Sequence, residues 1–226
     1  MHPESVAVLR ELLDERFSCR AFRPDPVPRP VQERLLALAQ RTASWCNSQP
    51  WQVHIVGGRA TERFRALMQA PAVPDEPGPD FAWPQAYQGV YQERRRECAM
   101  ALYDSVGITR GDREASAAQT RENFRFFGAP HVAMITSDAS LGVYGAVDCG
   151  GFVANFLLAA TSLGVATVPQ AALASRPQRV RDFFGLSPDR LVVCGISFGY
   201  ADGTHPANGF RTTRASLGAV ADWQEE

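Results

Sequence analysis

The chain has 226 residues, of which 45% are hydrophobic and 21% charged, and its formal net charge is -1. This composition is typical of one globular domain with an ordinary core, and the near-neutral charge disfavours nucleic acid or anionic lipid as a partner. No apolar run approaches the roughly 20 residues that span a bilayer, and the N-terminus lacks a signal-peptide pattern, so no membrane partner is expected.

The first half of the chain is predicted to contain helices around a single strand. Apolar spacing and an Arg29-Pro30 start signal predict helices over residues 4–15, 29–39 and 60–69, and a strand over 52–58. Residues 71–84 contain five prolines, so they cannot form regular structure. A polar helical region is then expected to about residue 127, with an interruption near residues 107–111.

The second half is predicted to carry most of the sheet. Strands are expected over residues 131–137, 165–170 and 190–200, a buried apolar helix over 148–164, and a helix over 177–184 that ends at Gly185. The tail after residue 200 is rich in turn residues. Because helices and strands do not alternate regularly, the pattern favours an α+β fold over a doubly wound sheet.

One local pattern matches the nucleophile elbow of serine hydrolases, Gly-x-Ser-x-Gly around Ser197. An elbow requires a helix directly after the serine, whereas residues 200–203 form a turn. Asp202 and His205 also lie too close in sequence to be the usual triad partners. A serine on a strand of small residues is therefore favoured, and a hydrolase remains a minor alternative.

Metal and phosphate-loop motifs are missing from the sequence. The four histidines are isolated, and His54 and His131 are expected to be structural. Five scattered cysteines without a Cys-x-x-Cys pair disfavour a disulfide framework or a zinc site, which favours a reducing cytoplasm. Without a glycine-rich loop, any phosphate must be bound by side chains.

Suitable side chains lie near both ends of the chain. Arg16, Ser18 and Arg20 occupy alternate positions after the first helix, and alternate residues of an extended segment point the same way. Two guanidinium groups and a hydroxyl would bind a phosphate dianion well. Arg211 and Arg214 lie in the tail. A second interpretation stays open, in which Arg16 complements the negative end of the helix and the others are solvated.

Four segments in order resemble the nitroreductase family, specifically its nitroaromatic-reducing subgroup. They are "RFSCRAFRPDPVP", "SWCNSQPWQVHIV", "DCGGFVANFLLAATSLGVATVPQ" and "GISFGYADGTHPANGFRTTRASL". The resemblance covers nearly the whole chain. It implies a single domain over residues 1–226, with a variable insertion at about 70–128 and a C-terminal extension at about 201–226 that reaches a partner subunit. The implied assembly is an intertwined homodimer with FMN in its interface.

The resemblance also implies the residues around the cofactor. Arg16, Ser18 and Arg20 match positions that hold the flavin phosphate, ribityl chain and pyrimidine end, and Phe17 stands where a polar residue is frequent. Arg211 and Arg214 match basic tail positions near the phosphate. A turn from the other subunit and a loop past the ring supply the remaining contacts, Ser44, Trp45, Asn47, Pro169, Gln170, Ala171 and Ala172.

Within the turn, the side chains are expected to differ in role. Asn47 can donate and accept hydrogen bonds at once, so we expect it to contact the flavin. Gln49 and Trp51 are expected to support the turn instead. In the variable region, Tyr87 and Arg94 belong to a group that could line the substrate mouth or form the wet face of a helix, and both interpretations remain open.

The implied activity passes two electrons from NADH or NADPH to a small nitroaromatic in a ping-pong sequence, with no protein acid or base as a catalytic residue. Arg20 would stabilise the anionic reduced flavin. The alternatives are a same-fold reductase of quinones, enones, flavins or halophenols, and a flavin-binding protein without catalytic activity.

Overall fold

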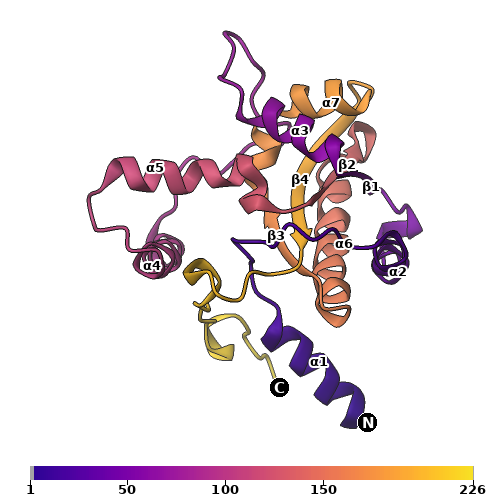
Figure 1. The fold of residues 1–226 in the computed structure, drawn as a ribbon. Helices are drawn as coiled ribbons and strands as arrows, with labels where there is room; N and C mark the ends of the chain where they lie inside the picture. The colour runs from indigo at the N-terminus through magenta and orange to yellow at the C-terminus, as the bar shows by residue number, and fades with distance from the viewer. Residues whose placement is uncertain (1–2, 226) are drawn as a thin grey trace.

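A computed structural model describes residues 3–225. Its centre is an antiparallel sheet with the strand order β1-β2-β4-β3 (Figure 1). The strands are β1 (Gln52–Gly57), β2 (His131–Asp138), β3 (Ala166–Gln170) and β4 (Arg190–Gly199). Helices and strands share one chain without regular alternation, so the predicted α+β fold with an antiparallel sheet is confirmed.

The helices are α1 (Pro3–Glu15), α2 (Arg29–Ala39), α3 (Arg59–Gln69), α4 (Gly89–Ser105), α5 (Arg113–Arg121), α6 (Gly142–Ser162) and α7 (Pro177–Phe184). The predicted helices are all present, although α6 begins six residues before the predicted start at residue 148, and the predicted polar helical region forms α4 and α5. The proline-rich stretch 71–84 has no helix or strand. Helix α7 ends where Gly185 adopts φ 65°, a left-handed conformation that glycine adopts at low cost.

The sheet is covered on both faces, which explains the continuous apolar run of β2. Ala133 and Ile135 face the core formed with α6 and α2, whereas Val132 and Met134 face the core formed with α3 and α7. Successive strand residues point to opposite faces, and here both faces are buried. A strand in this position therefore shows no alternation of polar and apolar residues.

The expectation that no apolar stretch is long enough to span a membrane is wrong for the region of helix α6. Residues Ala139–Ser162 meet that criterion by length and composition. In the structure, Phe152 and Phe156 on this helix are almost fully buried against the sheet. The helix is not buried all round, however, since Val143 and Val147 are 66% and 61% exposed.

The proline-rich stretch is held to the body by two ion pairs that are almost fully buried. Arg179 pairs with Glu76, and Arg181 pairs with Asp80 at 2.8 Å. Asp80 also accepts a hydrogen bond of 2.7 Å from the backbone N–H of Val192, beside the bulge in the β2–β4 pairing. A segment without regular hydrogen bonds is thereby fixed through side chains.

His131 links the segment before α2 to the sheet. Its Nε2 accepts a hydrogen bond of 3.0 Å from the N–H of Val27, and its Nδ1 lies 3.3 Å from the carbonyl oxygen of Val56. Burial lowers the pKa of His131, and it also lowers that of His54, which contacts Thr136 Oγ1 at 3.1 Å. The expected structural role of both histidines is confirmed.

The buried neutral imidazole predicts a loss of stability in acid. A group whose pKa is lower in the folded than in the unfolded state binds more protons when unfolded, so stability falls as pH drops below about 6.5. His131→Gln keeps one donor and one acceptor but cannot titrate. Urea unfolding at pH 7.5 and 5.5 should therefore give a smaller acid loss in this variant than in the wild type. Equal losses would contradict the assignment.

Candidate functional site

The segment after α1 is extended and lies along the outer edge of β3. Ser18 forms a parallel bridge with Thr167, and the N–H of Cys19 donates a hydrogen bond of 2.9 Å to the carbonyl oxygen of Thr167. Cys19 is fully buried. Because neighbouring residues of an extended segment alternate in direction, Ser18 and Arg20 face away from that core.

Asn208 fastens the tail to the same segment. Its Oδ1 accepts a hydrogen bond of 2.7 Å from the backbone N–H of Arg20, and its Nδ2 donates to the carbonyl oxygens of Ala21 and Asp202 at 2.9 and 2.8 Å. The side chain is buried. Sequence reasoning missed this residue, and the only available signal was a Pro-Ala-Asn-Gly turn.

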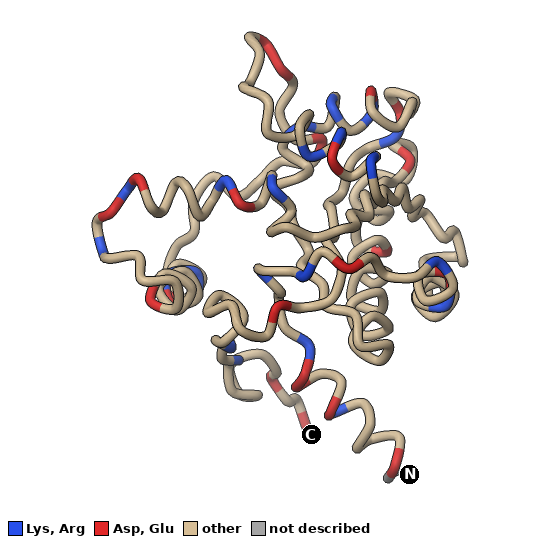
Figure 2. Tube along the Cα trace, viewed as in Figure 1, with Lys and Arg blue, Asp and Glu red and all other residues tan. Residues whose placement is uncertain are grey.

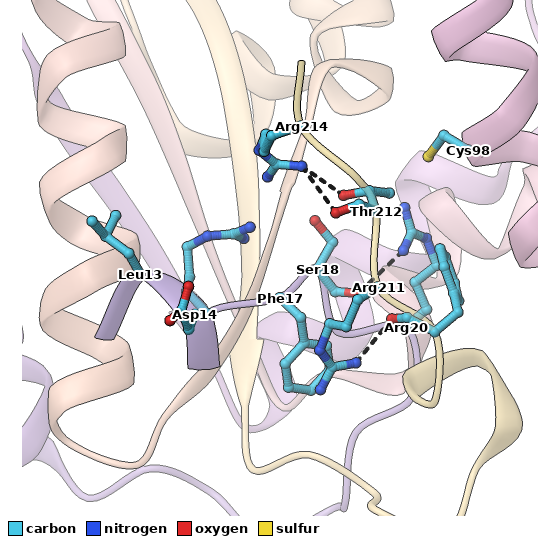
Figure 3. Close-up of a pocket in the computed structure, with 11 residues that line it drawn as sticks. Leu13, Asp14, Phe17, Ser18, Arg20, Cys98, Arg211, Thr212 and Arg214 are labelled. Carbon is cyan, nitrogen blue, oxygen red and sulfur yellow. Dashed lines mark hydrogen bonds between the residues drawn. The ribbon is translucent and has the colours of Figure 1, made fainter. Parts of the chain in front are cut away.

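The two chain ends enclose a cavity of about 440 Å³, here called the arginine cavity (Figure 3). Six of the expected site residues line it, Arg16, Phe17, Ser18, Arg20, Arg211 and Arg214. The expectation from alternation is met, although Phe17 also reaches the cavity. The other lining residues were not predicted and are Leu13, Asp14, Cys98, Phe210 and Thr212.

The arginine cavity is strongly electropositive. Its four guanidinium groups form no ion pair within residues 3–225, and Asp14 is the one acid among the lining residues. Burial lowers the pKa of Arg16, and the charges of Arg214 and Arg211 lower it further. Figure 2 shows basic residues of the segment after α1 and of the tail in the lower part of the molecule. Such an arrangement of cations favours the binding of an anion.

Two of these arginines are held by aromatic rings. The guanidinium of Arg211 lies 4.1 Å from the ring centre of Phe17, and that of Arg20 lies 5.5 Å from the ring centre of Phe210. Arg211 also donates hydrogen bonds to the carbonyl oxygens of Asn208 and Phe210. A planar guanidinium held in this way keeps donors directed toward a ligand.

In a second large cavity, unlike in the arginine cavity, most of the arginine charge is neutralised within the protein. This second cavity measures about 520 Å³ and is also lined by three arginines, Arg59, Arg65 and Arg125. Here Arg65 pairs with Glu62 and donates to two carbonyl oxygens, and Arg125 lies 3.6 Å from Glu122. Its charge is largely neutralised, so it does not share the anion preference of the arginine cavity.

The turn that contains Ser44, Trp45 and Asn47 lies elsewhere in the chain and does not line the arginine cavity. The N–H of Trp45 donates a hydrogen bond of 3.1 Å to Asp148 in the second turn of α6, and the Trp45 side chain is 61% exposed. Asn47 has φ 55°, and its neighbour Cys46 has φ 50°. Non-glycine residues in this conformation store strain and are found preferentially at functional sites.

A chain of amides supports the turn from behind. Trp51 Nε1 donates to Gln40 at 2.9 Å, Gln40 donates to Gln49 at 2.9 Å, and Gln49 donates to Asn47 Oδ1 at 3.2 Å. Trp51 is buried against Phe152. The supporting role predicted for Gln49 and Trp51 is confirmed, and the Nδ2 group of Asn47 points to no partner within residues 3–225.

At the end of β3, Gln170 is occupied within the protein. Its side chain is buried, accepts a hydrogen bond from Ser197 Oγ, and donates to the carbonyl oxygen of Asn123 at 2.9 Å. Only its backbone is left for a ligand. Pro169 lies beside Arg20 in a small cavity of about 180 Å³, and Ala171 and Ala172 follow it in the next turn.

The hydrolase alternative fails on the same contacts. Ser197 is fully buried within β4, and its hydroxyl is bonded to Gln170. The flanking glycines serve packing, since a Cβ on Gly195 would lie 2.5 Å from Leu173 Cδ1, and one on Gly199 would lie 2.6 Å from Pro130 Cδ. Within residues 3–225, no group of three His, Cys, Asp or Glu residues gathers to hold a metal.

The nitroreductase family model matches residues 13–200, which is most of the chain. The chain belongs to the nitroreductase family. It is 37% identical to nitroreductase NfnB of Mycolicibacterium smegmatis over 91% of this chain and 88% of that protein. It is 31% identical to a 4-nitrobenzoate reductase of Pseudomonas putida, over 88% of each chain.

Solved nitroreductase structures agree with the fold. FMN-dependent NfnB from Mycobacterium smegmatis in complex with NADPH aligns with a TM-score of 0.92 at 35% identity, covering 97% of this chain and 99% of that one. FMN- and NADPH-dependent NfnB from Sphigopyxis sp. strain HMH aligns with a TM-score of 0.87 at 30% identity over 96% and 99%. This nitroreductase family member is therefore an oxidoreductase.

The contacts of Asn208 predict that it stabilises the site of this nitroreductase. Asn208→Ala removes three hydrogen bonds and leaves buried groups unpaired, so unfolding free energy should fall by about 2–3 kcal/mol. Gln92→Ala, at an exposed position inside helix α4, is the matched control and should cost less than about 1 kcal/mol. Urea unfolding measures both, and similar losses for the two variants would refute the assignment.

Proposed function

We propose that this nitroreductase is an FMN-dependent, cytoplasmic enzyme that passes two electrons from NAD(P)H to small nitroaromatic compounds. The observation that carries the proposal is the arginine cavity, in which both ends of the chain supply cations that have no carboxylate partner among residues 3–225. Relatives described as FMN-dependent, and others described as reductases of 4-nitrobenzoate and chloronitrobenzene, support this cofactor and this substrate class.

The residues of the arginine cavity suit FMN. Arg16, Arg211 and Arg214 would hold the phosphate dianion, with the hydroxyl of Ser18 beside them. Arg20 lines both this cavity and the small cavity at Pro169, so in this proposal it would face the flavin ring. The backbone of residues 169–172 would then pass the ring edge, where Gln170 is fixed by Ser197 and Asn123.

Bound FMN would supply the redox chemistry, the two-electron transfer from NAD(P)H to the acceptor, in a ping-pong order. The protein's part is to bind and orient. Arg20 would stabilise negative charge at the pyrimidine end, and burial together with its contact to Phe210 keeps its position fixed. No side-chain acid or base is required by this scheme.

The site is completed by a second copy of the chain in this proposal. The turn of Ser44, Trp45 and Asn47 does not line the arginine cavity, and Trp45 and Asn47 are exposed, so the residues of this turn would reach the flavin of a partner. Exposed apolar side chains on three elements support a large interface. These are Val6, Val8, Leu9 and Leu13 on α1, Val143, Tyr144 and Val147 on α6, and Leu217, Val220 and Trp223 in the tail.

The proposal predicts a coloured dimer. The purified protein should show flavin absorbance, bleach on addition of NAD(P)H without oxygen, and regain colour on addition of 4-nitrobenzoate. Sedimentation should give twice the mass of the chain, because each site needs residues from two copies. A colourless protein that refuses added FMN and sediments as a single chain would reject both parts of the proposal.

Arg20 should set the reduction potential. In Arg20→Ala the anionic reduced flavin loses its cation, so the two-electron potential should become more negative by about 30 mV or more, equivalent to ~1.4 kcal/mol. Arg23→Ala is the matched control, since Arg23 is exposed and lines none of the three cavities that Arg20 lines. Potentiometric titration that finds the same potential in both variants would contradict the role of Arg20.

A further inference from the structure

A second electropositive cavity lies on the other side of the tail. It measures about 470 Å³ and is here called the tail cavity. It shares Arg211 and Arg214 with the arginine cavity, and helix α4 adds Arg94 and Glu97. The irregular tail segment from Arg211 to Arg214 thus lines two cavities, each of which contains arginines.

The charges of the tail cavity favour an anion. Three guanidinium groups face one carboxylate, and Glu97 is already engaged, because it accepts a hydrogen bond of 3.0 Å from Thr213 Oγ1. This bond also fixes the tail against α4. The exposed Arg94 has neither an ion pair nor a side-chain hydrogen bond with the described part of the chain. An arginine without a partner beside two others attracts a multivalent anion.

The three consecutive arginines of α4 differ in their surroundings. Arg95 lies over the ring of Tyr87 at 5.4 Å, and Arg96 lines neither the arginine cavity nor the tail cavity. Arg94 alone of the three reaches the tail cavity. Helical geometry explains the difference, because neighbouring residues point about 100° apart around the axis.

We propose that Arg94 binds the 2′-phosphate of NADPH and makes this enzyme prefer NADPH to NADH. The inference rests on the proposed function. There, the FMN phosphate occupies the arginine cavity and is offset by Arg16, Arg211 and Arg214, which leaves Arg94 as the additional cation of the adjoining tail cavity. A dinucleotide that stacks on that flavin must place its other phosphates nearby. The 2′-phosphate is a dianion that NADH lacks, and two relatives are described as binding or depending on NADPH.

Donor kinetics test the assignment directly. With a saturating nitroaromatic acceptor, the FMN-loaded wild type should show a kcat/KM for NADPH about tenfold or more above that for NADH. Arg94→Gln should lose about tenfold for NADPH and less than twofold for NADH. Arg96→Gln removes the same charge from the same helix and should change neither value. Raised salt should weaken the NADPH preference of the wild type.

Three kinetic results would overturn the proposal. They are equal use of both donors by the wild type, an equal loss for both donors in Arg94→Gln, and an unchanged NADPH preference in that variant. An equal loss would place the diphosphate, which both donors carry, at Arg94. The FMN content of each variant is measured by absorbance, so that a loss of flavin is not mistaken for a loss of donor binding.

Calorimetry gives a readout independent of turnover. Adenosine 2′,5′-bisphosphate should bind the wild type and Arg96→Gln about tenfold more tightly than it binds Arg94→Gln, whereas adenosine 5′-monophosphate should not distinguish the three. Equal binding of the bisphosphate to all three proteins refutes the role of Arg94. Failure of the proposed function is seen separately, as a wild type that neither retains FMN nor oxidises NADPH.

Discussion

The hydrogen bonds of Asn208 join the two ends of the chain, and the site depends on that junction. Arg16 and Arg20 leave α1 in an extended segment tied to β3, whereas Arg211 and Arg214 arrive almost 200 residues later. Like charges repel, so the two segments stay together only through contacts that outweigh the repulsion, among them the packing of Arg211 over Phe17. A buried amide that bonds the backbone at Arg20, Ala21 and Asp202 supplies the attraction that the charges oppose.

The arginine cavity therefore carries a cost that the rest of the fold offsets. Four guanidinium groups line it without ion pairs among the described residues, and the pKa of Arg16 falls because it is buried near two other cations. Elsewhere in this protein buried arginines are neutralised, as Arg179 is by Glu76 and Arg181 by Asp80. The difference indicates that the charges of the arginine cavity serve a ligand rather than the stability of the fold.

The sequence was sufficient to predict the elements and the convergence of arginines. Apolar spacing predicted most of the helices. The alternate positions of Arg16, Ser18 and Arg20 predicted that these three side chains point to the same side. Asn208 was missed because one asparagine in a turn has no pattern that distinguishes it from ordinary turn chemistry. The exposed apolar face of α6 was also not predicted, because a single sequence does not distinguish apolar residues that are buried in a core from those that remain exposed.

Gln170 and Ser197 show a different limit. The sequence suggested that one contacts a flavin and raised the question of whether the other is a nucleophile, but the two side chains are bonded to each other in the core. The two residues are 27 positions apart in the sequence, and the β3–β4 pairing brings them together. Contacts made by sheet pairing are set by tertiary structure, so local motifs around either residue could not reveal them.

The account depends most on a phosphate held by cations from both chain ends. Calorimetric titration of the flavin-free protein with FMN and with riboflavin, which differ only in that phosphate, tests it most directly. The account predicts that FMN binds about a hundredfold more tightly than riboflavin, as expected when two or more charge-assisted hydrogen bonds are lost. Equal affinities for the two flavins would contradict it.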